Sequence, residues 1–122
     1  MGARVVIAED EALIRLDLKE TLEEEGYEVV GETGRGEEVL PLVREHRPDL
    51  AILDIKMPGE DGLSAAAAIS AERLAAVVIL TAFSQRELVD RARESGALAY
   101  LVKPFQRNDL VPAIELAMGR FE

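Results

Sequence analysis

The stretch LAILDIKMPGEDGL (residues 50–63) contains the pattern that decides the fold. Its first four residues form a continuous apolar run, which is typical of a strand that is covered on both faces. The run ends in a carboxylate at Asp54, and after a turn with Pro and Gly an amphipathic stretch begins at Leu63. A buried strand, a turn and a helix in this order are the unit from which parallel sheets are built.

Four further runs rich in Val, Ile and Leu repeat this pattern, namely VVIA (5–8), YEVV (27–30), VVILT (77–81) and AYLV (99–102). Amphipathic stretches with helical spacing fill the intervals between the runs. Five strand–helix units predict one α/β domain over residues 1–122, with a parallel sheet, right-handed crossovers and helices on both faces. The run at 27–30 has acidic residues in and after it, which indicates an edge strand.

Composition narrows the function classes. The chain has 122 residues, no cysteine and one histidine, so a disulfide framework, a thiolate metal site and a His-rich metal cluster are excluded. Its net charge of -10 disfavours direct binding to the phosphates of DNA or RNA. No apolar run approaches the roughly 20 residues of a membrane span, and no secretory signal precedes the first run, so we expect a cytoplasmic protein.

Polar residues follow four of the five runs, and the carboxyl ends of parallel strands meet at one edge of a sheet, where ligands bind. The residues at these ends are Glu9, Asp10 and Glu11; Asp54; Thr81; and Lys103 and Pro104. Clustered carboxylates repel one another unless a hard divalent cation with oxygen ligands, such as Mg²⁺, lies among them. A carboxylate can also attack phosphorus and form an acyl phosphate, whose oxygens then need an ammonium and a hydroxyl nearby.

The sequence resembles the receiver domain of two-component response regulators over essentially its whole length. The motifs that carry the resemblance are AEDE (8–11), LDIKMPGEDGL (53–63), LTAF (80–83) and AYLVKPF (99–105). It implies a flavodoxin-like, doubly wound sheet of strand order 2-1-3-4-5 with five helices. It also implies a phosphorylation-dependent switch rather than an enzyme, in which a sensor histidine kinase donates a phosphoryl group to Asp54.

The resemblance assigns a metal site to the same edge of the sheet. Asp10 and Asp54 would hold Mg²⁺ (or Mn²⁺) directly, together with the backbone carbonyl of Lys56. Glu9 would act through water, because many members of the family have Asp at this position and Glu here departs from that pattern. Thr81 and Lys103 would contact the phosphoryl group.

Other residues match positions of the switch. Tyr100 would turn inward when Thr81 moves, and the peptide bond before Pro104 would be cis. The surface that changes would be the fourth helix, the fifth strand and the fifth helix, around residues 84–122, where a partner, an output domain or a second copy of the chain would dock. Phe83 would screen the phosphoryl group from water.

A narrower resemblance lies in EDEALIRLDLKETLEEEGYEVVGE (9–32), LTAFSQRELV (80–89) and LVKPF (101–105). These segments are similar to receivers of regulators whose second half is an RNA-binding antiterminator (ANTAR-like) domain. No such output domain is expected within residues 1–122.

Three other interpretations compete with this one. A flavin-binding version of the fold gives no reason for the acidic cluster, which would repel a flavin phosphate. A Mg²⁺-dependent phosphatase with an Asp nucleophile would need a second Asp two residues after Asp54, where the sequence has Lys56. A receiver fold that only binds partners, without phosphorylation, usually lacks the acceptor Asp, the acidic pair or the Lys, and all of these are present.

Overall fold

The computed structural model of the chain describes residues 2–59, 61–82, 90–91 and 93–121. Its strands are β1 (Arg4–Ala8), β2 (Glu28–Thr33), β3 (Leu50–Asp54), β4 (Ala76–Thr81) and β5 (Ala99–Val102). Its helices are α1 (Ala12–Glu24), α2 (Val39–His46), α3 (Gly62–Ala71) and α5 (Arg107–Phe121), with a 3₁₀ turn η1 (Gly36–Glu38) before α2. None of the helices in these ranges combines the length and the apolarity needed to cross a membrane.

The five strands form one parallel sheet in the order β2-β1-β3-β4-β5, so the predicted strand order is confirmed. Every residue of β3 and β4 is buried, as their continuous apolar runs predict. The second strand lies at an edge, as predicted, but it extends beyond the apolar run at 27–30 because Gly31 to Thr33 continue the pairing with β1.

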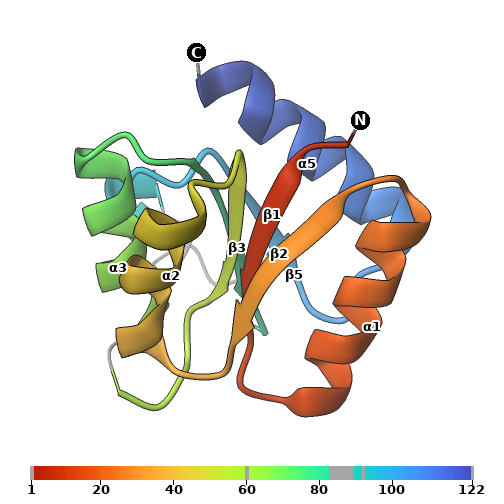
Figure 1. Cartoon of the computed structure of the whole chain (residues 1–122), viewed down its shortest axis with the longest axis horizontal. Helices are drawn as coiled ribbons and strands as arrows, with labels where there is room; N and C mark the ends of the chain where they lie inside the picture. Colours follow the sequence, from red (N-terminus) through yellow and green to blue (C-terminus); the bar gives the residue numbers. More distant parts are fainter. Residues whose placement is uncertain (1, 60, 83–89, 92, 122) are drawn as a thin grey trace.

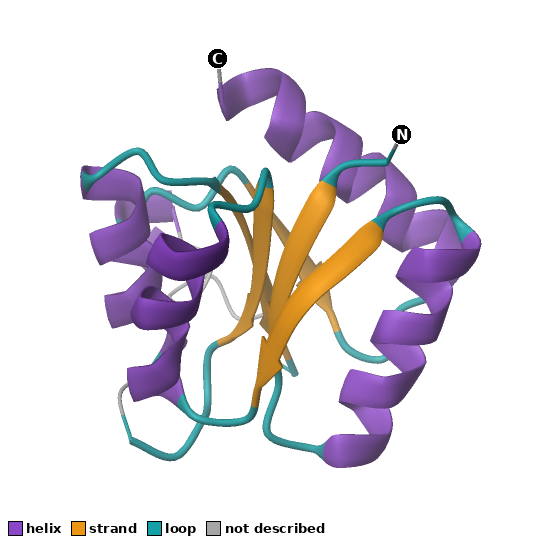
Figure 2. Cartoon of the chain, viewed as in Figure 1, coloured by secondary structure: helices purple, strands orange, loops and turns teal. Residues whose placement is uncertain are grey.

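Helices cover both faces of the sheet (Figures 1 and 2). The alternating side chains of a strand point to opposite faces, so β3 contributes Ala51 and Leu53 to one core and Leu50 and Ile52 to the other. The first core packs against α2 and α3, and the second packs against α1 and α5. The sheet is therefore held rigidly between two layers, and its carboxyl edge is left for the loops.

The structure describes the predicted fourth helix in part and the last helix, α5, from Arg107 to Phe121. The predicted fourth helix falls mainly outside the described residues, although residues 90, 91, 93 and 94 are helical. Helix α5 begins at Arg107, so Pro112 lies in its second turn rather than at its first residues, where a missing N–H is tolerated best. An N–H at this position would bond to the carbonyl of Asn108, so the helix loses one internal hydrogen bond there.

The beginning of α3 is packed tightly against the end of β3. The N–H of Gly62 donates to the carbonyl of Ile55 at 2.9 Å, and the Asp61 carboxylate caps the helix by accepting from the N–H of Ser64 at 2.8 Å. A Cβ at position 62 would lie 1.9 Å from the backbone oxygen of Asp54. Only glycine allows this approach, which fixes the backbone around Asp54.

We predict that Gly62→Ala lowers the free energy of unfolding by about 1–3 kcal/mol, because the added methyl group forces α3 away from β3. Urea unfolding followed by circular dichroism measures the change. Gly119→Ala in α5 is the control: its Cβ would meet nothing within 4 Å, so stability should rise by up to about 1 kcal/mol through helix propensity. Equal stability of Gly62→Ala and the unsubstituted protein would contradict the tight approach.

Candidate functional site

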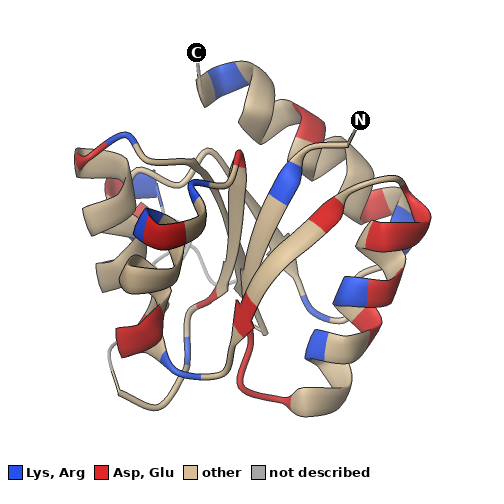
Figure 3. Cartoon of the chain, in the orientation of Figure 1, with Lys and Arg blue, Asp and Glu red and all other residues tan. Residues whose placement is uncertain are grey.

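A cavity of about 200 Å³ opens at the carboxyl edge of the sheet. It is lined by Asp10, Glu11, Asp54, Ile55, Lys56, Thr81, Ala82 and Lys103. Acidic residues occupy the loop that leads from β1 to α1, at the lower edge of the sheet in Figure 3. The structure thus brings the predicted residues from four strand ends to one place, although they are far apart in the sequence.

The Lys103 ammonium joins two of the carboxylates. Its Nζ lies 2.8 Å from Oε1 of Glu9 and 3.0 Å from Oδ2 of Asp54. The backbone N–H of Lys103 donates to the carbonyl of Thr81 at 2.7 Å, which fixes the start of the side chain beside the end of β4. The peptide bond between Lys103 and Pro104 is cis, the isomer that the resemblance predicts.

Glu9 is fully buried, and both of its carboxylate oxygens have partners. Oε1 accepts from Lys103, and Oε2 accepts from the backbone N–H of Glu11 at 3.1 Å. A buried carboxylate is stable only when it is paired and hydrogen-bonded, and Glu9 meets both conditions. In this arrangement Glu9 anchors Lys103, which is more than the assisting role that the sequence suggested.

Asp10 completes a group of three carboxylates. One carboxylate oxygen from each of Glu9, Asp10 and Asp54 lies within 4.8 Å of the others. The pKa of Asp10 is raised, first by partial burial and then by its hydrogen bond to Glu9 and the charge of Glu9. The pKa of Lys103 is also raised: burial, the largest influence, lowers it, but the hydrogen bonds and charges of Glu9 and Asp54 together outweigh burial.

This donor set fits Mg²⁺ or Mn²⁺. The three groups offer oxygen atoms only, which hard divalent cations prefer, and they stand close enough to share one ion. The charge of Glu9 contributes to the raised pKa of Asp10, after burial and the hydrogen bond, and a cation would relieve this like-charge repulsion. Lys56, expected to contribute its backbone carbonyl, lines the same cavity.

The remaining predicted residues are placed differently. Thr81 is buried at the end of β4 and lines the cavity. Tyr100 does not: its side chain is 45% exposed, and it lines a separate hollow of about 240 Å³ with Leu116 of α5. Phe83, expected to screen the site from water, lies outside the described residues.

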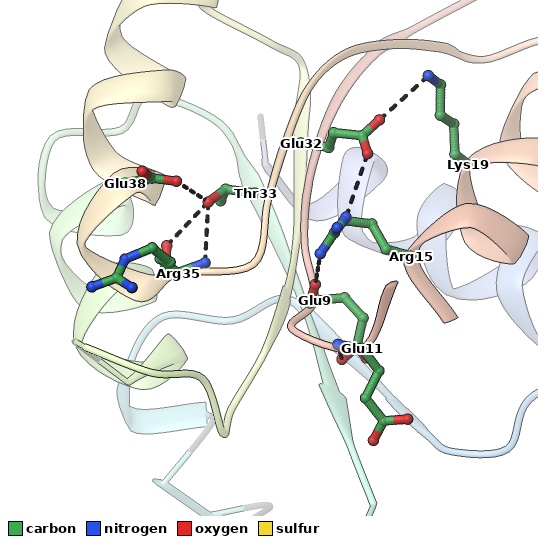
Figure 4. Close-up of polar contacts among 8 residues, drawn as sticks. All are labelled: Glu9, Glu11, Arg15, Lys19, Glu32, Thr33, Arg35 and Glu38. Carbon is green, nitrogen blue, oxygen red and sulfur yellow. Dashed lines mark hydrogen bonds and ion pairs between the residues drawn. The ribbon is translucent and has the colours of Figure 1, made fainter. Parts of the chain in front are cut away.

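Sequence reasoning missed a polar network behind the acidic loop (Figure 4). Arg15 of α1 donates from Nη1 to the backbone carbonyl of Glu9 at 2.6 Å, and its Nε lies 3.4 Å from Glu32 of β2. Lys19 also pairs with Glu32, at 3.3 Å. The sequence holds no signal for the first contact, because its acceptor is a backbone atom that every residue carries.

Comparison with known proteins agrees with this geometry. The chain belongs to the response regulator receiver domain family, whose model matches residues 5–115. It is 64% identical over 118 residues to the transcriptional regulatory protein PdtaR of Mycobacterium tuberculosis, and 36% identical over 120 residues to the chemotaxis protein CheY of Bacillus subtilis. The signal receiver domain of the putative response regulator NarL from M. tuberculosis has the same fold, with a TM-score of 0.91 and 33% identity over 97% of each chain.

The coverage differs between these relatives. The match covers 97% of this chain but 58% of PdtaR, so the chain spans less than two thirds of the length of that relative. With CheY the match covers 98% of this chain and all of the relative. The region shared by both is the receiver domain, which makes this chain a phosphorylation-dependent signalling switch of the two-component class.

We predict that Lys103→Met lowers the free energy of unfolding by about 2–3 kcal/mol in the presence of a chelator, because Glu9 is left buried without a counter-charge. Adding Glu9→Gln should restore part of this loss, since a neutral amide needs no ammonium. Urea unfolding of the two single variants and the double variant measures the coupling. Lys19→Met is the control, and its surface pair with Glu32 should cost less than about 1 kcal/mol. Strictly additive losses at Glu9 and Lys103 would contradict the pairing.

Proposed function

We propose that Asp54 is the phosphoacceptor of this receiver domain and that a sensor histidine kinase is its donor. The observation that supports this most directly is the position of the Lys103 ammonium, 3.0 Å from Asp54 in a cavity that also holds Asp10 and Thr81. The Asp54 side chain is only 7% exposed, so a donor reaches it through that cavity. Such a transfer belongs in the cytoplasm, where these kinases act on their receivers.

The chain's own groups would act as follows. A carboxylate oxygen of Asp54 attacks phosphorus, a carboxylate–phosphorus bond forms, and the bond from phosphorus to the donor's histidine nitrogen breaks. Lys103 and the Thr81 hydroxyl then donate to oxygens of the transferred group. Glu9 keeps the ammonium in place while Asp54 changes from a carboxylate to an acyl phosphate, because its own contact with Lys103 does not involve the reacting group.

Asp10, Asp54 and the backbone carbonyl of Lys56 would hold Mg²⁺ directly, and Glu9 would act through water. When bound, the ion would neutralise part of the negative charge of the carboxylates and of the phosphoryl oxygens. The three-carboxylate group supports this assignment.

The output would pass through β5 and α5 and through the fourth helix. Thr81 moves toward the phosphoryl group, and Tyr100 leaves its exposed position to fill the vacated space, which shifts the population between two packings. The hollow between Tyr100 and Leu116 would then change shape, and a partner, an output domain or a second copy of the chain would detect the change. The resemblance to receivers of antiterminator-type regulators, and the name of the relative PdtaR, support control of transcription as the output.

Two rival functions differ from the proposed one in what the protein would do with phosphate. A receiver fold that only binds partners would not take up phosphate, and a Mg²⁺-dependent phosphatase would release phosphate continuously from small phosphomonoesters. The position two residues after Asp54, where such a phosphatase has its second Asp, is Lys56, which lines the cavity. We therefore propose that the chain catalyses only its own phosphorylation and its own slow dephosphorylation.

We predict that Asp54→Asn abolishes labelling by radioactive acetyl phosphate in the presence of Mg²⁺, because an amide is not a nucleophile toward phosphorus. Asp17→Asn is the matched control: Asp17 is an exposed residue of α1, so its loss should leave labelling unchanged. A chelator should abolish labelling of the unsubstituted protein. Undiminished labelling of Asp54→Asn would overturn the assignment of the acceptor. If neither the unsubstituted protein nor any variant is labelled, a receiver fold that only binds partners is favoured.

A further inference from the structure

Arg15 contacts the backbone of the acidic loop through its side chain, and it does so from a neighbouring helix (Figure 4). It lies in the first turn of α1, and its side chain is 23% exposed. Its Nη1 donates to the carbonyl of Glu9 at 2.6 Å, and its Nε pairs with Glu32 at 3.4 Å. The guanidinium thus links a helix, the edge strand and the loop that holds the proposed metal ligands.

The contact with Glu9 acts on Asp10 through the geometry of the peptide bond. The carbonyl of Glu9 and the nitrogen of Asp10 belong to one planar unit, so holding the carbonyl oxygen fixes the plane from which Asp10 continues. The N–H of Glu9 is held as well, by the carbonyl of Thr33 at 3.0 Å. Both sides of Glu9 are therefore tied to neighbouring elements, and the direction of the Asp10 side chain depends on these ties.

Glycine at position 34 makes room for this arrangement. A Cβ on Gly34 would lie 2.9 Å from Nη1 of Arg15 and 3.4 Å from Cα of Asp10. The turn after β2 therefore packs directly against the guanidinium and the acidic loop. An added methyl group would displace the end of the Arg15 side chain, since that end is more easily moved than the backbone of Asp10.

We propose that Arg15 is a positioning residue for the metal site: through the Glu9 carbonyl it fixes the direction in which Asp10 presents its carboxylate. This inference rests on the proposed function. Glu32 supports the arrangement by orienting the guanidinium. Lys19 pairs with the same carboxylate, but the donor to the Glu9 carbonyl is Arg15. Partners that orient metal ligands typically change metal affinity by about 10–100-fold when they are replaced.

The test compares Mn²⁺ binding among variants of the chain of residues 1–122, with free Mn²⁺ quantified by its electron paramagnetic resonance signal. Arg15→Gln should weaken binding about tenfold. Gly34→Ala, which keeps every charge but displaces the guanidinium, should weaken it in the same direction. Lys19→Gln, which removes the other cation from Glu32, should bind Mn²⁺ like the unsubstituted protein.

A second readout separates positioning from a general loss of stability. With acetyl phosphate as donor, the Mg²⁺ concentration for half-maximal phosphorylation of Arg15→Gln should rise about tenfold, while the rate at saturating Mg²⁺ stays within about twofold. Loss of thermal stability in chelator without a change in metal affinity would show that Arg15 only ties α1 to β2, and would overturn the inference.

The other possible results of the Mn²⁺ experiment also test the role of Arg15. If the unsubstituted protein binds no Mn²⁺, the proposed function fails before the role of Arg15 is reached. If it binds and Arg15→Gln and Gly34→Ala bind equally well, the inference alone fails. If Arg15→Gln does not fold, Gly34→Ala decides by itself. If Arg15→Gln binds Mn²⁺ more weakly and Gly34→Ala binds it as the unsubstituted protein does, the effect comes from the charge of Arg15. That result would contradict positioning.

Discussion

The Lys103 ammonium between the carboxylates of Glu9 and Asp54 is the interaction on which the rest of the site depends. Glu9 has no access to solvent, so without a cation its charge would be very costly to bury. The cation comes from the far end of the chain, 94 residues away, and reaches Glu9 only because the sheet brings the ends of β1, β3, β4 and β5 to one edge. The site therefore forms only when the sheet is assembled in this strand order.

The same interaction explains why the site can act as a switch. Glu9 and Asp54 share one ammonium, and Asp10 lies beside them, so three carboxylates meet one cation at this edge and their charge is only partly compensated. A phosphoryl group on Asp54 would replace one of the two acceptors of Lys103 and add charge. Glu9, whose second oxygen is held by the N–H of Glu11, would keep the ammonium from moving away with it. We propose that the change is then taken up by Thr81, whose buried side chain lines the same cavity.

Much of this could be predicted from the sequence, because the signals were local. The apolar run that ends in Asp54, LAILD (50–54), and the run at 99–102 coincide with β3 and β5. The chemistry-bearing residues could be gathered because parallel strands present their carboxyl ends together. The extent of β2 could not be predicted, since Gly31 and Glu32 lack strand character and are held by pairing with β1. Nor could the residue at which α5 begins, because it depends on the loop after β5.

The contacts between the site residues were harder to predict than which residues form the site. The sequence predicts Glu9 beside a metal ion, whereas in the structure its carboxylate pairs with Lys103. This difference depends on the side chain of Glu being longer than that of Asp. Arg15 gave no signal at all, because its acceptor is the backbone carbonyl of Glu9. Residues whose partners are backbone atoms are recognised only once the chain is folded.

The most direct measurement is the chemical identity of the modified residue. The protein is treated with acetyl phosphate and Mg²⁺, the acyl phosphate is reduced with borohydride, and the peptides are sequenced by mass spectrometry. Reduction of an aspartyl phosphate yields homoserine, and the account predicts homoserine at position 54 and at no other aspartate. Homoserine at position 10, or an unmodified Asp54 after phosphate uptake, would contradict it.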